Sequence, residues 1–115
     1  MQWNEDHLHI LWTNGDSTTG QHMVLMYATN AVMNGWWKAV TVVLWGAPAQ
    51  LAVQDEAVRE RIHMAMHAGV KFSACIACAD RLGVTGALTD MGVEVMAWGQ
   101  PLTQLLKENR PLITI

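Results

Sequence analysis

The sequence predicts an α/β domain in which short strands alternate with helices. Two observations predict this class: apolar, β-branched runs recur along the chain, and helical patterns ending at glycine separate them. Such alternation implies a parallel sheet with helices on both faces. The 115 residues contain no repeat, low-complexity segment or Pro/Gly linker, so we expect a single domain over residues 1–115.

Five strands are expected, and the second carries the clearest signal. Residues 39–45 form a continuous apolar run, which is typical of a strand covered on both faces. The other candidates are shorter. The expected strands are residues 7–12, 39–45, 70–74, 93–98 and 111–115.

The helices are predicted from capping residues and from the spacing of apolar side chains. Ser17 or Thr18 can cap a first helix that stops at Asn34-Gly35, and Asp55 can begin an amphipathic helix that ends at Gly69. After the third strand, three shorter helices are expected. They are a helix that ends before Gly83, a helix over residues 85–91 and a helix over residues 102–108.

The composition excludes some functions and suggests assembly. A formal net charge of −3, with seven scattered basic residues, argues against binding nucleic acid or an anionic membrane. The charge-free stretch 17–37 is too polar to span a bilayer, and the acidic start is unlike a secretory signal, so a cytoplasmic protein is expected. Hydrophobic residues make up 51% and charged residues 15%, which favours a homo-oligomer that buries apolar surface.

The only two cysteines are the strongest chemical signal. Cys75 and Cys78 stand where the third strand leads into a helix. The unpaired N–H groups of a first helical turn favour the thiolate, which is the nucleophilic form. If Cys75 begins the helix, Cys78 lies one turn later on the same face, close enough to form a disulfide or share a sulfur atom. Two buried, inert cysteines are the alternative.

The predicted topology brings other side chains to the edge that holds Cys75. In open parallel sheets, ligands bind beyond the carboxyl ends of the strands. Asn14, Asp16, Trp45 and Trp98 all follow strand ends, so they are candidate pocket residues around the thiol. The tryptophans could instead be core or subunit-contact residues, and this alternative stays open.

Metal and cofactor sites are weakly indicated. His63 and His67 are spaced i,i+4 and could complete a zinc site with the two cysteines, but no second CxxC and no zinc-knuckle turn accompany them. The loop 14–20 lacks the Gly-Lys-Ser/Thr ending of a phosphate-binding loop. We therefore expect no metal and no cofactor.

Several segments together resemble the DsrE family, which includes sulfur-relay proteins, and the resemblance covers essentially the whole chain. They are Lys71 to Ala79 with Gly83-Val84, Met91 to Val95, Pro101-Leu102, the loop with Gly15-Asp16 and the strand Val40 to Gly46. The resemblance implies a three-layer α/β/α sandwich with a five-stranded parallel sheet. It also implies dimers, trimers or hexamers, of which we expect a trimer or hexamer first and a dimer next.

In sulfur-relay members of the family, one cysteine just after the third strand carries persulfide sulfur, and Cys75 matches it by position. Cys78 has no counterpart in the strict sulfur-relay subunits. The resemblance thus implies a sulfur carrier or sulfurtransferase-type protein with donor and acceptor partners, and whether it turns over as an enzyme stays open. The alternative is a CxxC thiol–disulfide redox module, or a small-ligand-binding oligomer without transfer activity.

Overall fold

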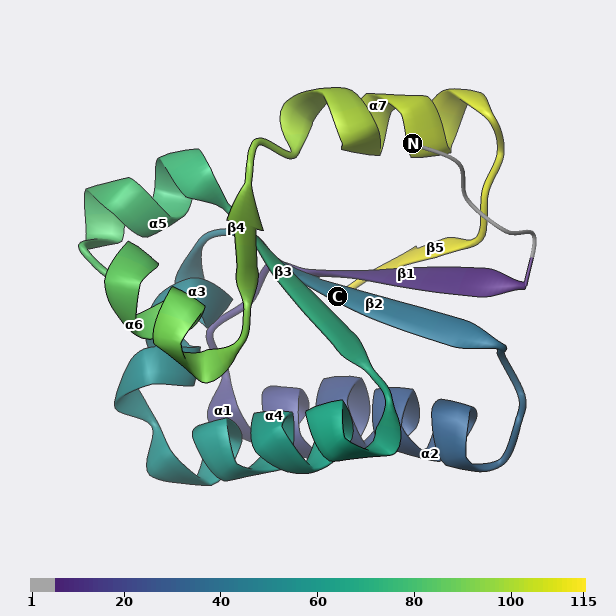
Figure 1. The fold of residues 1–115 in the computed structure, drawn as a ribbon, viewed down its shortest axis with the longest axis horizontal. Helices are drawn as coiled ribbons and strands as arrows, with labels where there is room; N and C mark the ends of the chain where they lie inside the picture. The colour runs from purple at the N-terminus through teal and green to yellow at the C-terminus, as the bar shows by residue number, and fades with distance from the viewer. Residues whose placement is uncertain (1–5) are drawn as a thin grey trace.

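The computed structural model describes residues 6–115, in which one parallel sheet lies between helices (Figure 1). All four strand pairings are parallel, and the spatial order is β4-β3-β2-β1-β5. The predicted α/β class and the five-stranded parallel sheet are thereby confirmed. The strands are β1 (His7–Trp12), β2 (Ala39–Leu44), β3 (Lys71–Cys75), β4 (Glu94–Met96) and β5 (Leu112–Thr114).

The two faces of the sheet differ in chemistry because side chains alternate along each strand. On one face, Ile10, Val42 and Phe72 stand in register across three strands and belong to the main apolar core. On the other face, the equivalent row of the same strands is polar. That row is His9, Thr41 and Lys71.

The helices are divided unequally between these faces (Figure 1). The main core lies under most of them, and residues 17–33 run through three consecutive segments without a break. Among the helices of residues 6–115, only α7 (Gly99–Lys107) covers the polar face, where its Leu105 is buried. The other helical segments are α1 (Ser17–Thr19), η1 (Gly20–Leu25), α2 (Met26–Met33), α3 (Ala47–Gln54), α4 (Glu56–Ala68), α5 (Ile76–Leu82) and α6 (Thr85–Met91).

Most helix ends follow the predicted signals. Asp55 caps α4 by accepting a hydrogen bond of 3.0 Å from the backbone N–H of Val58. Three glycines end α4, α5 and α6 in the left-handed conformation, which glycine adopts at little cost: Gly69, Gly83 and Gly92. The first helix, however, is capped by Asp16, one residue earlier than predicted.

Further features differ from the sequence-based prediction, among them helix α3 and the length of strand β4. Helix α3 was not predicted, because it follows Gly46 without a side-chain cap and its short Ala-rich sequence has little amphipathic pattern. Strand β4 is shorter than the predicted 93–98, since Trp98 is the residue before α7 rather than the end of the strand. Pro101 fits within the first turn of α7, where its missing N–H has no intrahelical partner to lose.

A π-helical segment, η1, interrupts the first helix directly over the end of β1. A Cβ on Gly20 would lie only 2.6 Å from Cζ2 of Trp12, a side chain with no exposed surface. The widened turn and the glycine together leave room for the indole under the helix.

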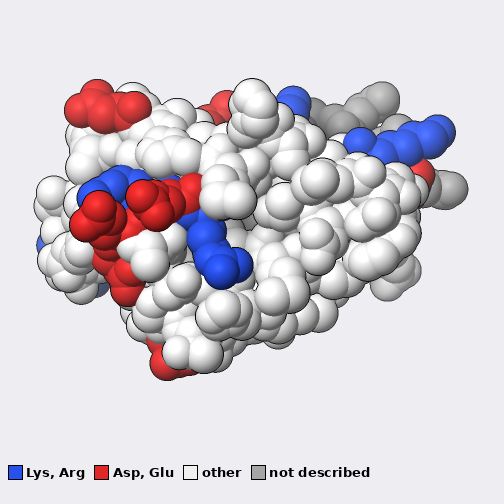
Figure 2. Space-filling view, turned by 90° about the horizontal axis from the view of Figure 1, so that it is seen from below, with Lys and Arg blue, Asp and Glu red and all other residues white. Residues whose placement is uncertain are grey.

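The outer surface of the larger helical layer is unevenly charged. Figure 2 shows acidic and basic side chains gathered toward one end of this layer, whereas much of the surface toward the other end is uncharged. Helix α2 contains no charged residue. Large apolar side chains are exposed on and beside η1, α2 and α4, namely Met23, Met26, Met33, Trp36 and Met64.

None of the helices in residues 6–115 combines the length and the apolar character that crossing a bilayer requires.

Candidate functional site

Cys75 lies at the end of β3 and is the residue immediately before α5. Its backbone is extended, with φ −71° and ψ 121°, so it occupies the N-cap position. The side chain is only 6% exposed and packs with Val43, Trp98 and Leu105, between the sheet and α7. We call these four residues the thiol cluster. The predicted strand-to-helix position of Cys75 is present in the structure.

Cys78 follows one helical turn later and is partly exposed at the side of the thiol cluster. Both cysteines are free thiols. Burial raises the pKa of Cys78, and the charge and hydrogen bonding of the adjacent Cys75 raise it further, against smaller lowering effects of the Gly46 backbone and Arg81. At neutral pH, Cys78 is therefore a protonated thiol beside Cys75.

The four predicted pocket residues are divided between two places. Trp98 is a member of the thiol cluster, and the partly buried Trp45 packs against it. Asn14 and Asp16 instead organise the start of the first helix. The backbone N–H of Asp16 donates to Oδ1 of Asn14 at 3.1 Å, and Oδ2 of Asp16 accepts from the backbone N–H of Thr19 at 2.8 Å.

Asp16 is fully occupied as a cap. Hydrogen bonds from the hydroxyl and backbone N–H of Thr19 lower the pKa of Asp16, so the carboxylate stays ionised and bound to the helix start. The side chain of Asp16 therefore stabilises the start of α1.

A hydrogen-bonded chain connects α7 to the sheet beside Cys75. Nε1 of Trp98 donates to Oγ of Ser73 at 2.7 Å, and that hydroxyl donates to the backbone carbonyl of Glu94 at 2.8 Å. Ser73 precedes Cys75 by two residues, so both side chains are on the same face of β3. The position of Trp98 over the thiol cluster is thus fixed by a polar contact as well as by packing.

Two histidines from β1 extend this polar group along the sheet. The rings of His7 and His9 stack with centroids 4.3 Å apart, and Nε2 of His7 lies 2.7 Å from the hydroxyl of Thr41. Burial and, secondarily, the charge of His7 lower the pKa of His9 to about 4. Burial and then the charge of Lys71 lower the pKa of His7. Both rings are therefore largely neutral at pH 7.

These polar residues lie beside a groove that the sequence-based reasoning missed. The groove has a volume of about 530 Å³, and its lining combines residues of the polar face with Met66, Val70 and Phe72 from the side of the main core. Alternating polar residues in the strands were the available signal, but Thr41 and Ser73 are isolated in otherwise apolar runs. We call this site the sheet groove; it is lined by His7, Thr41, Met66, Val70, Lys71, Phe72, Ser73, Gly92, Glu94, Met96 and Trp98.

The residues weighed for a zinc site are not brought together. His63 and His67 are exposed on α4, on the opposite side of the sheet from the thiol cluster. Within residues 6–115, no group of three or more His, Cys, Asp or Glu side chains could hold a metal ion.

Comparison with known proteins agrees with this architecture. A solved structure of a conserved protein of unknown function from Bacteroides thetaiotaomicron superimposes with a TM-score of 0.93 at 36% sequence identity, covering 96% of this chain and 95% of that one. No curated protein matches the chain. The model of the DsrE/DsrF-like family matches residues 8–115, nearly the whole length. The chain, with its five-stranded parallel sheet, belongs to the DsrE/DsrF-like family.

Proposed function

We propose that this protein is a cytoplasmic sulfur carrier of sulfurtransferase type, in which Cys75 holds persulfide sulfur. The observation that carries the proposal is the placement of two free thiols one helical turn apart at the end of β3, beside the partly exposed indole of Trp45. Family membership supports it. A carrier needs a nucleophilic thiol that a partner can reach and that is shielded from bulk oxidants.

Loading is a thiol-exchange reaction. The Cys75 thiolate attacks the terminal sulfur of a donor persulfide, a new S–S bond to Cys75 forms, and the donor leaves as a thiolate. Cys75 is the N-cap residue of α5, so the positive end of this helix lies beside it, although its side chain makes no cap hydrogen bond. Cys75 is 6% exposed, so sulfur reaches it through the partly exposed side of the thiol cluster, where Trp45, Cys78 and Met96 pack.

Cys78 is suited to a second, resolving step. Because its pKa is raised, it remains a protonated thiol while Cys75 reacts. Once deprotonated, it attacks Cys75 Sγ of the persulfide, forms the Cys75–Cys78 disulfide and releases hydrosulfide. A dithiol reductant then restores the two thiols.

Sulfur loading of single-cysteine variants tests this proposal. The wild type and two variants are incubated with a persulfide-generating desulfurase and its substrate, and sulfur uptake is followed by intact mass spectrometry. We expect Cys75→Ser to abolish uptake, whereas Cys78→Ser, the matched control one turn away, keeps uptake and changes the lifetime of the persulfide. Uptake by Cys75→Ser at Cys78 would reverse the two roles. No uptake by the wild type would contradict the proposal.

The contact between the two thiols also favours a second function, a redox module in which Cys75 and Cys78 cycle between dithiol and disulfide. The same mass spectra separate the two functions. A redox module loses two hydrogen masses on exposure to a thiol oxidant and gains no sulfur from the donor.

We further propose a homo-oligomer, a trimer or hexamer before a dimer, that exchanges sulfur with donor and acceptor proteins. The exposed apolar side chains of the helical layer support burial between subunits, among them Met33, Trp36 and Met64. Sedimentation velocity tests this assembly, and a monomer at all concentrations would exclude it.

A further inference from the structure

The sheet groove and Cys75 share one face of β3. Side chains alternate along a strand, so Lys71, Ser73 and Cys75 project to the same side. The first two line the groove, and Cys75 lies one step further along. On the neighbouring strand, Met96 pairs in register with Cys75 and also lines the groove. The groove therefore leads along β3 toward the thiol cluster.

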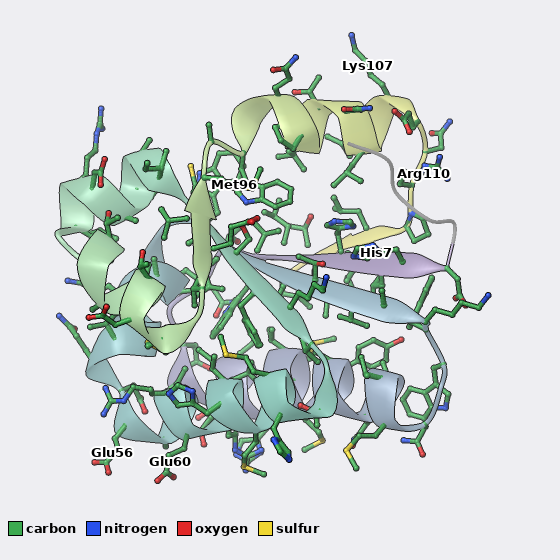
Figure 3. The ribbon with its side chains drawn as sticks, in the orientation of Figure 1. His7, Glu56, Glu60, Met96, Lys107 and Arg110 are labelled. Atoms are coloured by element: carbon green, nitrogen blue, oxygen red, sulfur yellow. The ribbon has the colours of Figure 1, made fainter. Side chains whose placement is uncertain are left out.

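Two of the residues that line the groove, His7 and Met96, are labelled in Figure 3. His7 lies on the α7 side of β1, and Met96 lies at the end of β4 near the start of α7. Trp98 belongs both to the groove lining and to the thiol cluster. It is the shared wall between the two sites.

The inner polar groups of the groove are already engaged with one another. Thr41 pairs with His7, and the hydroxyl of Ser73 accepts a hydrogen bond from Trp98 and donates one to the backbone carbonyl of Glu94. These contacts fix the floor. They leave the charged side chains at the rim as the groups that select a ligand.

The rim carries one cation and one anion. Lys71 and Glu94 are both exposed, and neither forms an ion pair with another residue in the range 6–115. They stand on adjacent strands, since Glu94 pairs in register with Ser73, two residues after Lys71. A ligand that bears a carboxylate and an ammonium a few atoms apart matches this arrangement.

The remaining lining suits an apolar, polarizable group. The thioethers of Met66 and Met96 and the indole ring of Trp98 line the groove. Thioether and thiol sulfur atoms contact such surfaces favourably. A volume of about 530 Å³ also lies within the roughly 300–1,000 Å³ range of small-molecule sites.

We propose that the sheet groove binds a small thiol that carries an α-amino acid group, and that the persulfide form of this molecule delivers sulfur to Cys75. The carboxylate faces Lys71, the ammonium faces Glu94, and the sulfur end lies toward Met96. The delivery step rests on the proposed function, whereas the binding step does not.

The chemical step balances without a further reagent. The Cys75 thiolate attacks the terminal sulfur of the bound persulfide, the Cys75–sulfur bond forms as the sulfur–sulfur bond of the donor breaks, and the donor leaves as its thiolate. The proton of the persulfide stays on the transferred sulfur. No net oxidation or reduction occurs.

Binding is tested apart from sulfur transfer with the unreactive probe S-methyl-L-cysteine. In protein labelled with ¹³C at the methionine methyl groups, we expect the signals of Met66 and Met96 to shift with added probe. The signals of Met33 and Met64, which are exposed on the far helical layer, stay in place as internal controls. Equal shifts at all methionines, or none at Met66 and Met96, would overturn the proposal.

The contribution of each charged residue to binding is tested with two variants and two probes, each of which lacks one charged group of the amino acid. Lys71→Gln weakens binding of S-methyl-L-cysteine about three- to fivefold, as for one exposed ion pair, but not that of S-methylcysteamine, which lacks the carboxylate. Glu94→Gln weakens the amino acid probe similarly, but not 3-(methylthio)propionate, which lacks the amine. Lys107→Gln on α7, outside the groove lining, changes none of them. Insensitivity to both variants would overturn the proposal.

Delivery is then measured with cysteine persulfide and with an uncharged donor, the persulfide of 2-mercaptoethanol. We expect the wild type to load faster from the amino acid donor, and Lys71→Gln to remove that advantage while loading from the uncharged donor is unchanged. Equal rates from both donors would overturn the delivery step. Methionine shifts without loading from any donor would instead contradict the sulfur-carrier function and leave the binding site standing.

Discussion

The indole nitrogen of Trp98 donates a 2.7 Å hydrogen bond to the hydroxyl of Ser73, and both side chains are buried where α7 meets the sheet. Ser73 in turn donates to the carbonyl of Glu94, so one polar chain links the start of α7, β3 and β4. Cys75 lies two residues beyond Ser73. The wall of the thiol cluster and the floor of the sheet groove thus depend on the same contact.

Replacing Trp98 by Phe removes this donor and keeps an aromatic ring. We expect the free energy of unfolding, measured by urea denaturation, to fall by about 1–2 kcal/mol. A buried hydrogen bond is lost, and the smaller phenyl ring leaves a cavity beside the thiol cluster. The control is Trp36→Phe at a side chain that is 57% exposed, with an expected change below about 0.5 kcal/mol. Similar losses in both variants would contradict the special role of Trp98.

His9 predicts a specific loss of stability in mild acid. Its folded-state pKa is lowered from 6.5 to about 4 by burial and by His7, so the unfolded chain takes up the proton first as the pH falls. The contribution of the neutral His9 ring to the free energy of unfolding is therefore fully present above pH 6.5. It is lost as the pH falls from 6.5 to 4, by about 3 kcal/mol in total.

The pH dependence of urea unfolding in His9→Phe measures this effect. The variant should have a clearly flatter profile between pH 6.5 and 4, with a residual slope because the pKa of His7 is also lowered. His63→Gln, at an exposed position on α4, should keep the wild-type slope. A wild-type slope in His9→Phe would disprove the assignment.

Two adjacent leucines of α7 test how this helix covers the thiol. Leu105 is 1% exposed in the thiol cluster, and Leu106 is 58% exposed. Leu105→Ala should cost about 2–5 kcal/mol of unfolding free energy, because it leaves a cavity over the sheet. It should also speed alkylation of Cys75, read by site-resolved mass spectrometry. Leu106→Ala should change neither quantity; faster alkylation in both variants would count against this role of Leu105.

Removing one thiol should change the reactivity of the other. Since Cys75 helps to raise the pKa of Cys78, Cys75→Ala should shift the pH profile of Cys78 alkylation by iodoacetamide toward lower pH. Burial is the larger cause and persists, so the profile should move only part of the way to that of an ordinary thiol. Ile76→Ala, an exposed neighbour, is the control. An unshifted profile in Cys75→Ala would mean that the two thiols are not coupled.

Much of the fold could be predicted because strong local signals coincide with its elements. Asp55 and Gly69 mark both ends of α4, and the apolar run of β2 reflects burial on both faces. The π-helical turn of η1 could not be predicted, because it depends on the contact of Gly20 with Trp12 across the chain. Local propensity carries no information about such a contact.

The candidate site was predictable at Cys75 and less so around it. Parallel topology alone places a residue that follows β3 at the carboxyl edge, and that inference needs no side-chain detail. Predicting the groove required knowledge of which strand face is covered by the single helix α7. Lys71 and Glu94 are 23 positions apart in the sequence, and only the pairing of β3 with β4 makes them neighbours.

The alternation along β3 has a consequence for how relatives of this protein can diverge. Phe72 and Ala74 belong to the main core, although Phe72 also lines part of the groove, whereas Lys71 and Ser73 lie on the opposite face of the strand. Substitutions at the exposed position 71 can therefore give a descendant new ligand preferences without repacking its interior, whereas the buried Ser73 is held by Trp98 and Glu94. A single-residue deletion in this strand would turn side chains to the opposite face of the sheet and bring the hydroxyl of Ser73 to the main core. Evolution of specificity at this site should proceed by replacement, with the length of β3 held constant.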